Sequence, residues 1–149
     1  MKLYPESSHI FTISESLNRY ILGGKAIVTL ESPGGKQHTY VYAIPRNSES
    51  FPDDVRFVYA LHDGKKEFYI GMLEQDKFRL TRNSRFLPDT EIVRGAKYIE
   101  KLRHSQMFLS NSPMKIYHQG TCARCGRKLL DIKSIERGFG LKCAKKLEG

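Results

Sequence analysis

The chain has 149 residues, of which 40% are hydrophobic and 16 are tyrosine or phenylalanine, enough for a packed core and too many for a disordered chain. No apolar run has the length of a membrane span and no secretory signal opens the chain, so we expect a soluble cytoplasmic protein without a membrane partner. The net charge of +9 lies entirely in residues 94–149, because residues 1–93 hold 12 basic and 12 acidic residues.

The first predicted element is a short helix in residues 13–24, with Ser14 as N-cap, an apolar face at Leu17, Tyr20 and Ile21, and a stop at Gly23. The pattern then changes to alternation with short turns, which is typical of an antiparallel meander. Five strands are expected, at residues 26–32, 38–46, 55–63, 68–75 and 77–83.

A second helix is predicted after residue 88, capped by Asp89 or Thr90. One face carries an apolar stripe, and the opposite face carries Arg94, Lys97, Lys101 and His104. A short strand at residues 114–118 is expected to lead the chain to its cysteines.

All three cysteines lie near the C-terminus. Cys122 and Cys125 form a CxxC pair followed by glycine, a spacing that lets two thiolates converge on one ion, and Cys143 follows after the sequence GFG. A redox CxxC would open a long helix, whereas glycine and a basic segment follow here, so we favour a metal. Zinc is preferred over iron because no fourth cysteine is present.

A structural zinc takes four ligands, and the best fourth candidate is His118, four residues before Cys122. His104 and Asp131 are poorer alternatives, since one lies on a different helix and the other offers a hard oxygen. The segment is small, and a structural zinc can contribute about 10 kcal/mol to its folding.

The stretch from residue 117 to 144 resembles a small zinc-finger-like module at the C-terminus of many uncharacterised phage and prophage proteins, with the pattern HxGxCxxCGRxL followed by DxxSIxxGxGxxC. The matching residues are His118, Gly120, Cys122, Cys125, Gly126, Arg127, Leu129, Asp131, Ser134, Ile135, Gly138, Gly140 and Cys143. The family usually has proline where this chain has Leu141. The resemblance covers about a fifth of the chain and implies Zn²⁺, His118 as fourth ligand and a phage origin, but no activity.

The basic residues around the cysteines predict a surface for DNA or RNA, although a solvated face is the alternative. They are Arg124, Arg127, Lys128, Lys133, Arg137, Lys142, Lys145 and Lys146, and the helix residues Arg94, Lys97 and Lys101 could extend this surface. Base stacking on strand aromatics is a weaker alternative, because alternating aromatics in strands more often belong to a core.

We expect no enzyme. Only six residues follow Cys143, without His or Asn, so the catalytic helix of zinc-stapled nucleases has no room, and His9, His38 and His62 are scattered along the chain. The predicted function is therefore non-catalytic binding of nucleic acid. The rival is a protein-binding module, such as a phage inhibitor of a host defence system of the anti-CRISPR or anti-restriction kind, and a purely scaffolding role is a third reading.

The predicted fold class is α+β, with a mostly antiparallel five-stranded sheet, two helices and a small C-terminal zinc-finger-like (Cys3His) module. The predicted organisation is a β-rich domain at residues 1–88, a helix and linker at residues 89–112, and a zinc-binding module at residues 113–149.

Overall fold

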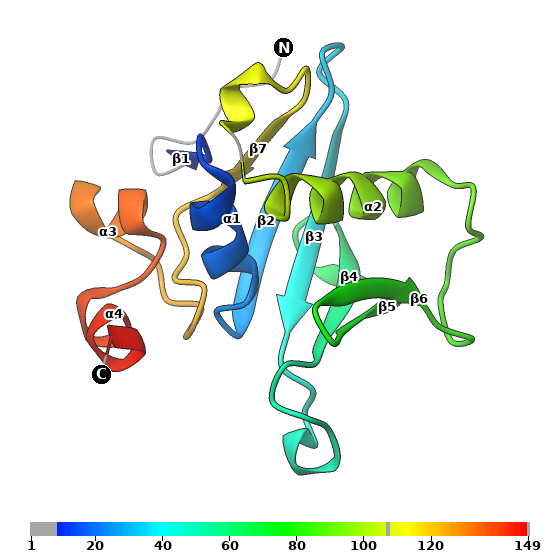
Figure 1. Ribbon diagram of the computed structural model, residues 1–149, viewed down its shortest axis with the longest axis horizontal. Coiled ribbons are helices and arrows are strands. Elements are labelled where there is room, and N and C mark those ends of the chain that lie inside the picture. Colours follow the sequence, from blue (N-terminus) through cyan, green and yellow to red (C-terminus); the bar gives the residue numbers. More distant parts are fainter. Residues whose placement is uncertain (1–8, 107, 149) are drawn as a thin grey trace.

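The computed structural model describes residues 9–106 and 108–148, and its centre is a seven-stranded sheet in the order β1-β7-β2-β3-β4-β5-β6 (Figure 1). All of these neighbouring strands pair antiparallel. The strands are β1 (His9–Ile10), β2 (Lys25–Glu31), β3 (Gln37–Ala43), β4 (Arg56–His62), β5 (Lys66–Glu74), β6 (Lys77–Leu80) and β7 (Lys115–His118). The helices are α1 (Ser14–Ile21), α2 (Glu91–Arg103), α3 (Ile132–Arg137) and α4 (Leu141–Glu148). Figure 1 shows α1 and α2 across one face of the sheet, with α3 and α4 beside α1 at one end of the molecule.

The prediction of five strands and two helices with a Cys3His module is wrong. The meander from β2 to β6 was predicted, but β7 inserts beside β2, where Thr29 pairs with Tyr117, and β1 pairs with the outer side of β7. A short strand at residues 114–118 was expected and is β7, but its place in the sheet was not predicted, because its partners lie far away in the sequence. The strand β1 has only two residues, too few for an alternating pattern. The additional helices α3 and α4 are also short, and both lie in the glycine-containing basic segment.

The core lies between the sheet and the two helices that cross it. Leu17 and Ile21 of α1 and Ile99 of α2 are fully buried against the strands. The hydroxyl of the buried Tyr40 donates to the carbonyl of Ile92 at 2.7 Å, so the inward-facing phenol keeps a hydrogen bond. A helix can approach Tyr40 this closely only at glycine, because a Cβ on Gly95 would lie 2.2 Å from the tyrosine oxygen.

The helices α1, α2 and α3 are capped at their N-termini in different ways. Ser14 is the first residue of α1 rather than its cap: Ile13 occupies the cap position, without a side-chain hydrogen bond. Thr90 caps α2, as expected, by accepting from the backbone N–H of Val93. Asp131 caps α3 by accepting from the backbone N–H of Ser134 at 3.1 Å.

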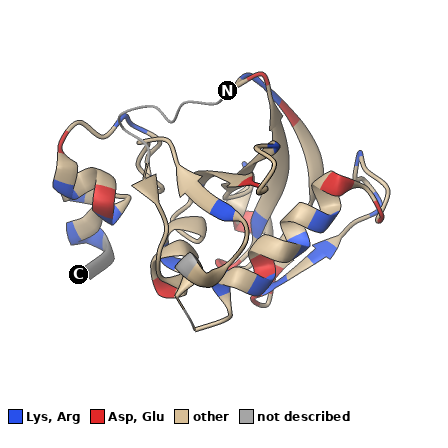
Figure 2. Ribbon diagram, turned by 90° about the horizontal axis from the view of Figure 1, so that it is seen from above, with Lys and Arg blue, Asp and Glu red and all other residues tan. Residues whose placement is uncertain are grey.

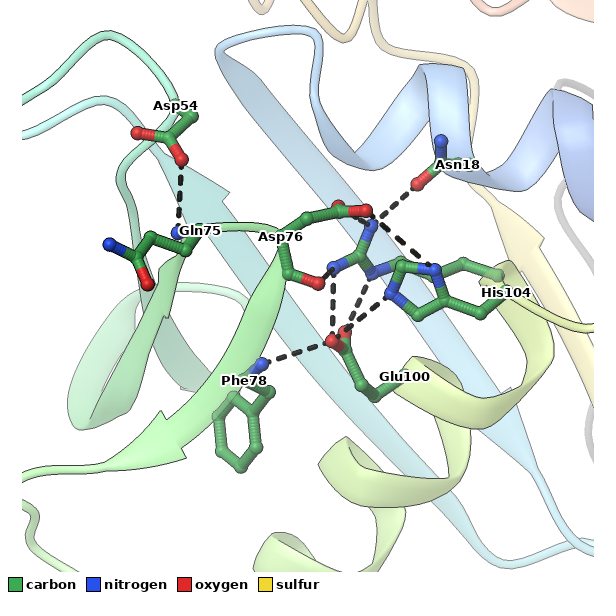
Figure 3. Close-up of polar contacts among 8 residues, drawn as sticks. Asn18, Asp54, Gln75, Asp76, Phe78, Glu100 and His104 are labelled. Carbon is green, nitrogen blue, oxygen red and sulfur yellow. Dashed lines mark hydrogen bonds and ion pairs between the residues drawn. The ribbon is translucent and has the colours of Figure 1, made fainter.

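A buried arginine, Arg103, joins α2 to its neighbours, and Figure 3 labels its partners Asn18, Asp76 and Glu100. The Arg103 guanidinium, with no exposed side-chain surface, donates to both oxygens of Glu100, at 2.6 and 3.0 Å, and to Asn18 of α1 at 2.6 Å. It also donates to the carboxylate and the carbonyl of Asp76, at 2.8 and 3.1 Å. Since an unpaired charge in this position would be strongly destabilising, these partners fix α1, α2 and the β5–β6 turn relative to one another.

The β5–β6 turn itself is strained. Gln75 and Asp76 have φ angles of 53° and 62°, the left-handed conformation that glycine or asparagine usually supplies in a two-residue hairpin turn. Two contacts compensate: Asp54 accepts from the Gln75 backbone N–H at 2.9 Å, and Arg103 binds Asp76 (Figure 3). The buried charge therefore also holds an unfavourable turn in place.

Candidate metal centre and basic surface

The three cysteines meet in space. The sulfur atoms of Cys122, Cys125 and Cys143 all lie within 4.8 Å of one another. Cys122 and Cys143 are buried, whereas Cys125 is exposed, so the cluster sits at the surface with two of its sulfurs turned inward. Three soft donors at this spacing can hold one metal ion.

A tight hairpin fixes the positions of Cys122 and Cys125. The backbone N–H of Gly126 donates to the carbonyl of Cys122 at 2.8 Å, and the N–H of Cys122 donates to the carbonyl of Arg127 at 2.8 Å. Gly126 has a φ of +77°, which explains why glycine follows the CxxC pair. A short bridge between Thr121 and Lys128 extends this hairpin.

The third cysteine is brought to the hairpin by the break between α3 and α4. Gly138 ends α3 at a φ of +82°, and a Cβ there would lie 2.6 Å from the ring of Tyr20. The carbonyl of Gly138 then accepts from Ala123, and the N–H of Gly140 donates to the sulfur of Cys122 at 3.4 Å. Cys143 follows in the first turn of α4.

The surroundings of the cluster shift the pKa values of Cys122 and Cys125 in opposite directions. Burial alone raises the pKa of Cys122, but backbone N–H groups that include that of Gly140 outweigh it and bring this pKa to about 7. At Cys125 the N–H of Arg127 lowers the pKa, while desolvation and the other two sulfurs outweigh it and raise the pKa above its ordinary value. The Cys122 thiol therefore ionises near neutral pH, and the resulting thiolate is the form that binds a metal.

His118 lies outside this cluster, which corrects the Cys3His set. It is fully buried at the end of β7, and its ring stacks on Tyr20 with centroids 4.7 Å apart. Its Nδ1 accepts from the N–H of Gly120 at 3.0 Å, and its Nε2 lies 2.8 Å from the carbonyl of Ile135 and therefore donates to it. Burial, supported by nearby His9, lowers the pKa of His118 to about 4 in spite of the hydrogen bond to Ile135. Both ring nitrogens of this neutral imidazole are used in holding the fold.

The two poorer candidates for a fourth ligand are also engaged elsewhere. Asp131 caps α3, and hydrogen bonds from the Ser134 side chain and backbone lower its pKa. His104 is the C-cap residue of α2, and its ring nitrogens lie 3.3 Å from Glu100 and 3.8 Å from Asp76. Among residues 9–106 and 108–148, the metal-type cluster consists of the three cysteines alone.

The C-terminal unit, residues 113–148, is joined to the body through β7, which is a strand of the central sheet, and through contacts with α1 and the start of β2. The Tyr20 hydroxyl donates to the carbonyl of Thr121 at 2.6 Å, and the N–H of Lys25 donates to the carbonyl of Ala123 at 2.6 Å. A Cβ on Gly23 would lie 2.7 Å from that of Ala123, so the backbones touch. The cysteine hairpin is therefore anchored to the core rather than tethered by a loop.

The predicted basic residues fall into two groups, seen in blue in Figure 2. On the C-terminal unit all are exposed except Arg137, which is half-buried and donates to the Phe139 carbonyl and the Ser134 hydroxyl. The exposed ones are Arg124, Arg127, Lys128, Lys133, Lys142, Lys145 and Lys146. Arg94, Lys97 and Lys101 are exposed on α2, which α1 separates from α3 and α4 (Figure 1). The α2 cations thus form a second, separate group.

Three large aliphatic side chains of the C-terminal unit are unexpectedly exposed. Leu130, Ile132 and Leu141 are 86%, 74% and 57% exposed. Leu129, next to Leu130, is buried, and its Cδ2 lies 4.0 Å from the Cβ position of Gly140, next to Leu141. Adjacent aliphatic residues beside a helix cap carry no periodic signal that could have separated the buried one from the exposed ones.

The strand aromatics divide between the two faces of the sheet. Tyr40 and Tyr42 are core residues and unavailable for base stacking. Phe57 and Tyr59 each meet Tyr69 edge to face, with centroids 5.7 Å apart, and all three are partly buried. These rings mainly contact one another, which is the packing role expected of alternating strand aromatics.

In the described residues, no helix combines the length and the apolar character that crossing a bilayer requires. Residues 113–148 match the family described as Family of unknown function (DUF6011). Neither the curated proteins nor the solved structures contain a match to the chain. The family match coincides with the C-terminal unit and includes all three cysteines.

Proposed function

We propose that this is a non-catalytic nucleic-acid-binding protein whose C-terminal unit is held together by Zn²⁺. The observation that carries the proposal is the placement of seven exposed lysines and arginines within residues 124–146, around the three-sulfur cluster. Phosphate groups are the commonest partners of such a surface.

The donor set fits zinc. Three thiolates are soft ligands typical of structural zinc sites, and the N–H of Gly140 directed at the Cys122 sulfur is the hydrogen bond expected for a charged ligand. Cys122, Cys125 and Cys143 would hold the ion, with a fourth donor from solvent or from a group outside the described cluster. The ion's contribution is structural: it joins the hairpin at residues 121–128 to α4.

The net positive charge around such a zinc site favours an anionic partner. Three thiolates and one Zn²⁺ leave a charge of −1, which the surrounding cations exceed. Because the hairpin and α4 are anchored to the body, the cations that they carry can meet phosphates with little loss of conformational freedom. Binding should therefore be strong at low salt and weaken steeply as salt rises.

The test compares two triple charge reversals. One changes Arg124, Lys128 and Lys142 to Glu, and the matched control changes Arg94, Lys97 and Lys101 of α2 to Glu, so that the net charge falls equally. We expect the first protein to lose binding to single-stranded and double-stranded DNA and RNA in fluorescence anisotropy at low salt, and the second to retain it. Equal losses would show a general charge effect, and no binding of the unmodified protein at low salt would end the proposal.

A second candidate, a protein-binding module such as an inhibitor of a host defence protein, is favoured by the exposed Leu130, Ile132 and Leu141. Exposed aliphatic side chains of this kind mark protein interfaces more often than nucleic-acid ones. A pull-down from lysate with and without nuclease separates the readings: a partner that survives nuclease and moderate salt, and is lost in a Leu130→Ser/Ile132→Ser protein, supports the second candidate.

A further inference from the structure

The sheet end farthest from the cysteines forms an open pocket of about 690 Å³. Its floor consists of β3, β4 and β5, and its wall is the segment between β6 and the first turn of α2, on the side of the molecule away from α3 and α4 (Figure 1). The side chains that define it are His38, His62, Phe68, Arg85, Phe86 and Ile92. Its size lies within the range of small-molecule sites.

Strand register brings together two histidines that are far apart in the sequence. Thr39 pairs with Leu61 in the antiparallel β3–β4 ladder, so one step further His38 faces His62 across the strands. Ala60 pairs with Phe68 of β5, which continues the same face of the sheet. An imidazole pair and a phenyl ring thus line one side of the pocket.

The wall opposite is fixed by its own hydrogen bonds. The N–H of Arg85 donates to the carbonyl of Tyr69 at 2.8 Å, and the Ser84 hydroxyl bonds both the carbonyl and the N–H of Phe86 at 3.2 Å. The Arg85 guanidinium carbon lies 5.7 Å from the centre of the Phe68 ring, and the His62 ring meets that same ring edge to face at 6.4 Å. The Arg85 guanidinium thus lies over the Phe68 ring, and the His62 imidazole meets the same ring.

The ion pairs around the pocket involve most of its charged side chains in the part of the chain that the structure describes. Asp63 pairs with His62 at 3.4 Å, and Glu91 pairs with Lys36 and with His38. The exposed Arg85 has no carboxylate partner among the described residues. A ligand that suits the pocket thus carries an anionic group for Arg85 and a flat apolar group for the space between Phe68, Phe86 and Ile92.

We propose that this pocket binds a nucleoside monophosphate unit, with its base in the space between Phe68, Phe86 and Ile92 and its phosphate at Arg85. Guanidinium and phosphate form strong paired hydrogen bonds, and an aromatic ring stacks on any base. The unit can come from a free nucleotide or from the phosphorylated end of a strand. This site is separate from the basic surface of the C-terminal unit, and it does not depend on the function proposed for that surface.

Isothermal titration calorimetry of the full chain with AMP, adenosine and inorganic phosphate tests the proposal. We expect saturable binding of AMP that is at least about tenfold tighter than that of either fragment, and a loss of about tenfold in Arg85→Gln. Arg82→Gln is the matched control, because Arg82 is an exposed cation of the same segment outside the pocket lining. Phe68→Leu should weaken the binding of AMP and adenosine but leave the binding of phosphate unchanged. A thermal unfolding curve of this variant checks that it is folded.

No saturable AMP binding at millimolar concentration, or AMP binding that Arg85→Gln does not weaken, overturns the proposal. A 5′-phosphorylated single-stranded oligonucleotide distinguishes the two sources: tighter binding than AMP, weakened by Arg85→Gln, identifies a strand end, and binding no tighter identifies the free nucleotide. Reversal of Arg124, Lys128 and Lys142 should leave AMP binding unchanged, so failure of one proposal is distinguishable from failure of the other.

Discussion

The body around α2 and the C-terminal unit are stabilised by different means. In the body, two helices bury their apolar faces on the sheet, and the buried Arg103 donates its hydrogen bonds to groups of the protein such as Asn18 and Asp76. In the C-terminal unit, Leu130 and Ile132 remain exposed, and the hairpin meets α4 through sulfur atoms and backbone groups. Leu129 and Phe139 of the unit do join the common core. We therefore expect the body to keep its fold through side-chain contacts alone, and residues 119–148 to depend in addition on a metal ion held by the three sulfurs.

Removal of a cysteine ligand should have the largest effect and tests this dependence directly. We expect elemental analysis to find one metal ion per chain in the unmodified protein and none in Cys143→Ser. Because a structural zinc contributes on the order of 10 kcal/mol, the amides of residues 119–148 should lose their protection from hydrogen exchange. The amides of β3, β4 and α2 should keep theirs.

The Thr121→Ser protein is a suitable control, since it changes a residue next to Cys122 without removing a sulfur. It should keep one metal per chain and normal protection. An unmodified protein that contains no metal and still protects the C-terminal amides would contradict the dependence, as would a Cys143→Ser protein in which the body unfolds equally.

Removal of the buried cation tests the other side of the comparison. Arg103→Met leaves Glu100 and Asp76 without their partner and releases the strained turn, so we expect a loss of about 3–5 kcal/mol in the free energy of unfolding by urea. Arg19→Met, which removes an exposed pair with Glu15 at 3.7 Å, should cost under about 1 kcal/mol. Similar losses in both variants would show that the buried network has no special role.

The predictable parts of this molecule were those with local signals. The meander from β2 to β6 follows from alternation and short turns, α2 from its apolar stripe, and the sulfur cluster from the CxxC spacing. The place of β7 was not predictable, because four residues carry little pattern and their partner Thr29 is distant in the sequence. The contacts of Arg103 were equally hidden, since they join α1, α2 and a turn.

His118 shows how a correct motif can suggest a wrong ligand. A histidine four residues before a CxxC pair has the right donor type, and sequence alone cannot reveal that both of its nitrogens are taken. Its neighbours Gly120 and Ile135 occupy those nitrogens, and Tyr20 covers the ring. The motif predicted that this residue matters, but its role in the structure is to join β7, α1 and α3.

The pH dependence of His118 provides the next largest effect. Its folded pKa of about 4 lies below the ordinary value of 6.5, so the unfolded chain takes up a proton first as the pH falls. The neutral ring contributes fully above pH 6.5, and about 3 kcal/mol is lost between pH 6.5 and pH 4. We expect the stability difference between the unmodified protein and His118→Gln to shrink over this window, while metal content at pH 7 stays at one per chain. Loss of the metal in His118→Gln would return the histidine to the ligand set.

Removal of one helix cap in each region should change the free energy of unfolding least. It also compares the body and the C-terminal unit with the same kind of substitution. Thr90→Ala removes the cap of α2, which shares the central core, so it should lower the global free energy of unfolding by about 1 kcal/mol. Asp131→Ala removes the cap of α3, a six-residue helix whose exposed start contacts little of the body. It should loosen the amides of residues 132–138 in hydrogen exchange while leaving the urea midpoint of the body and the metal content unchanged. If Asp131→Ala instead lowers global stability as much as Thr90→Ala, the two regions unfold as one unit, and the metal then stabilises the whole chain rather than its C-terminal unit.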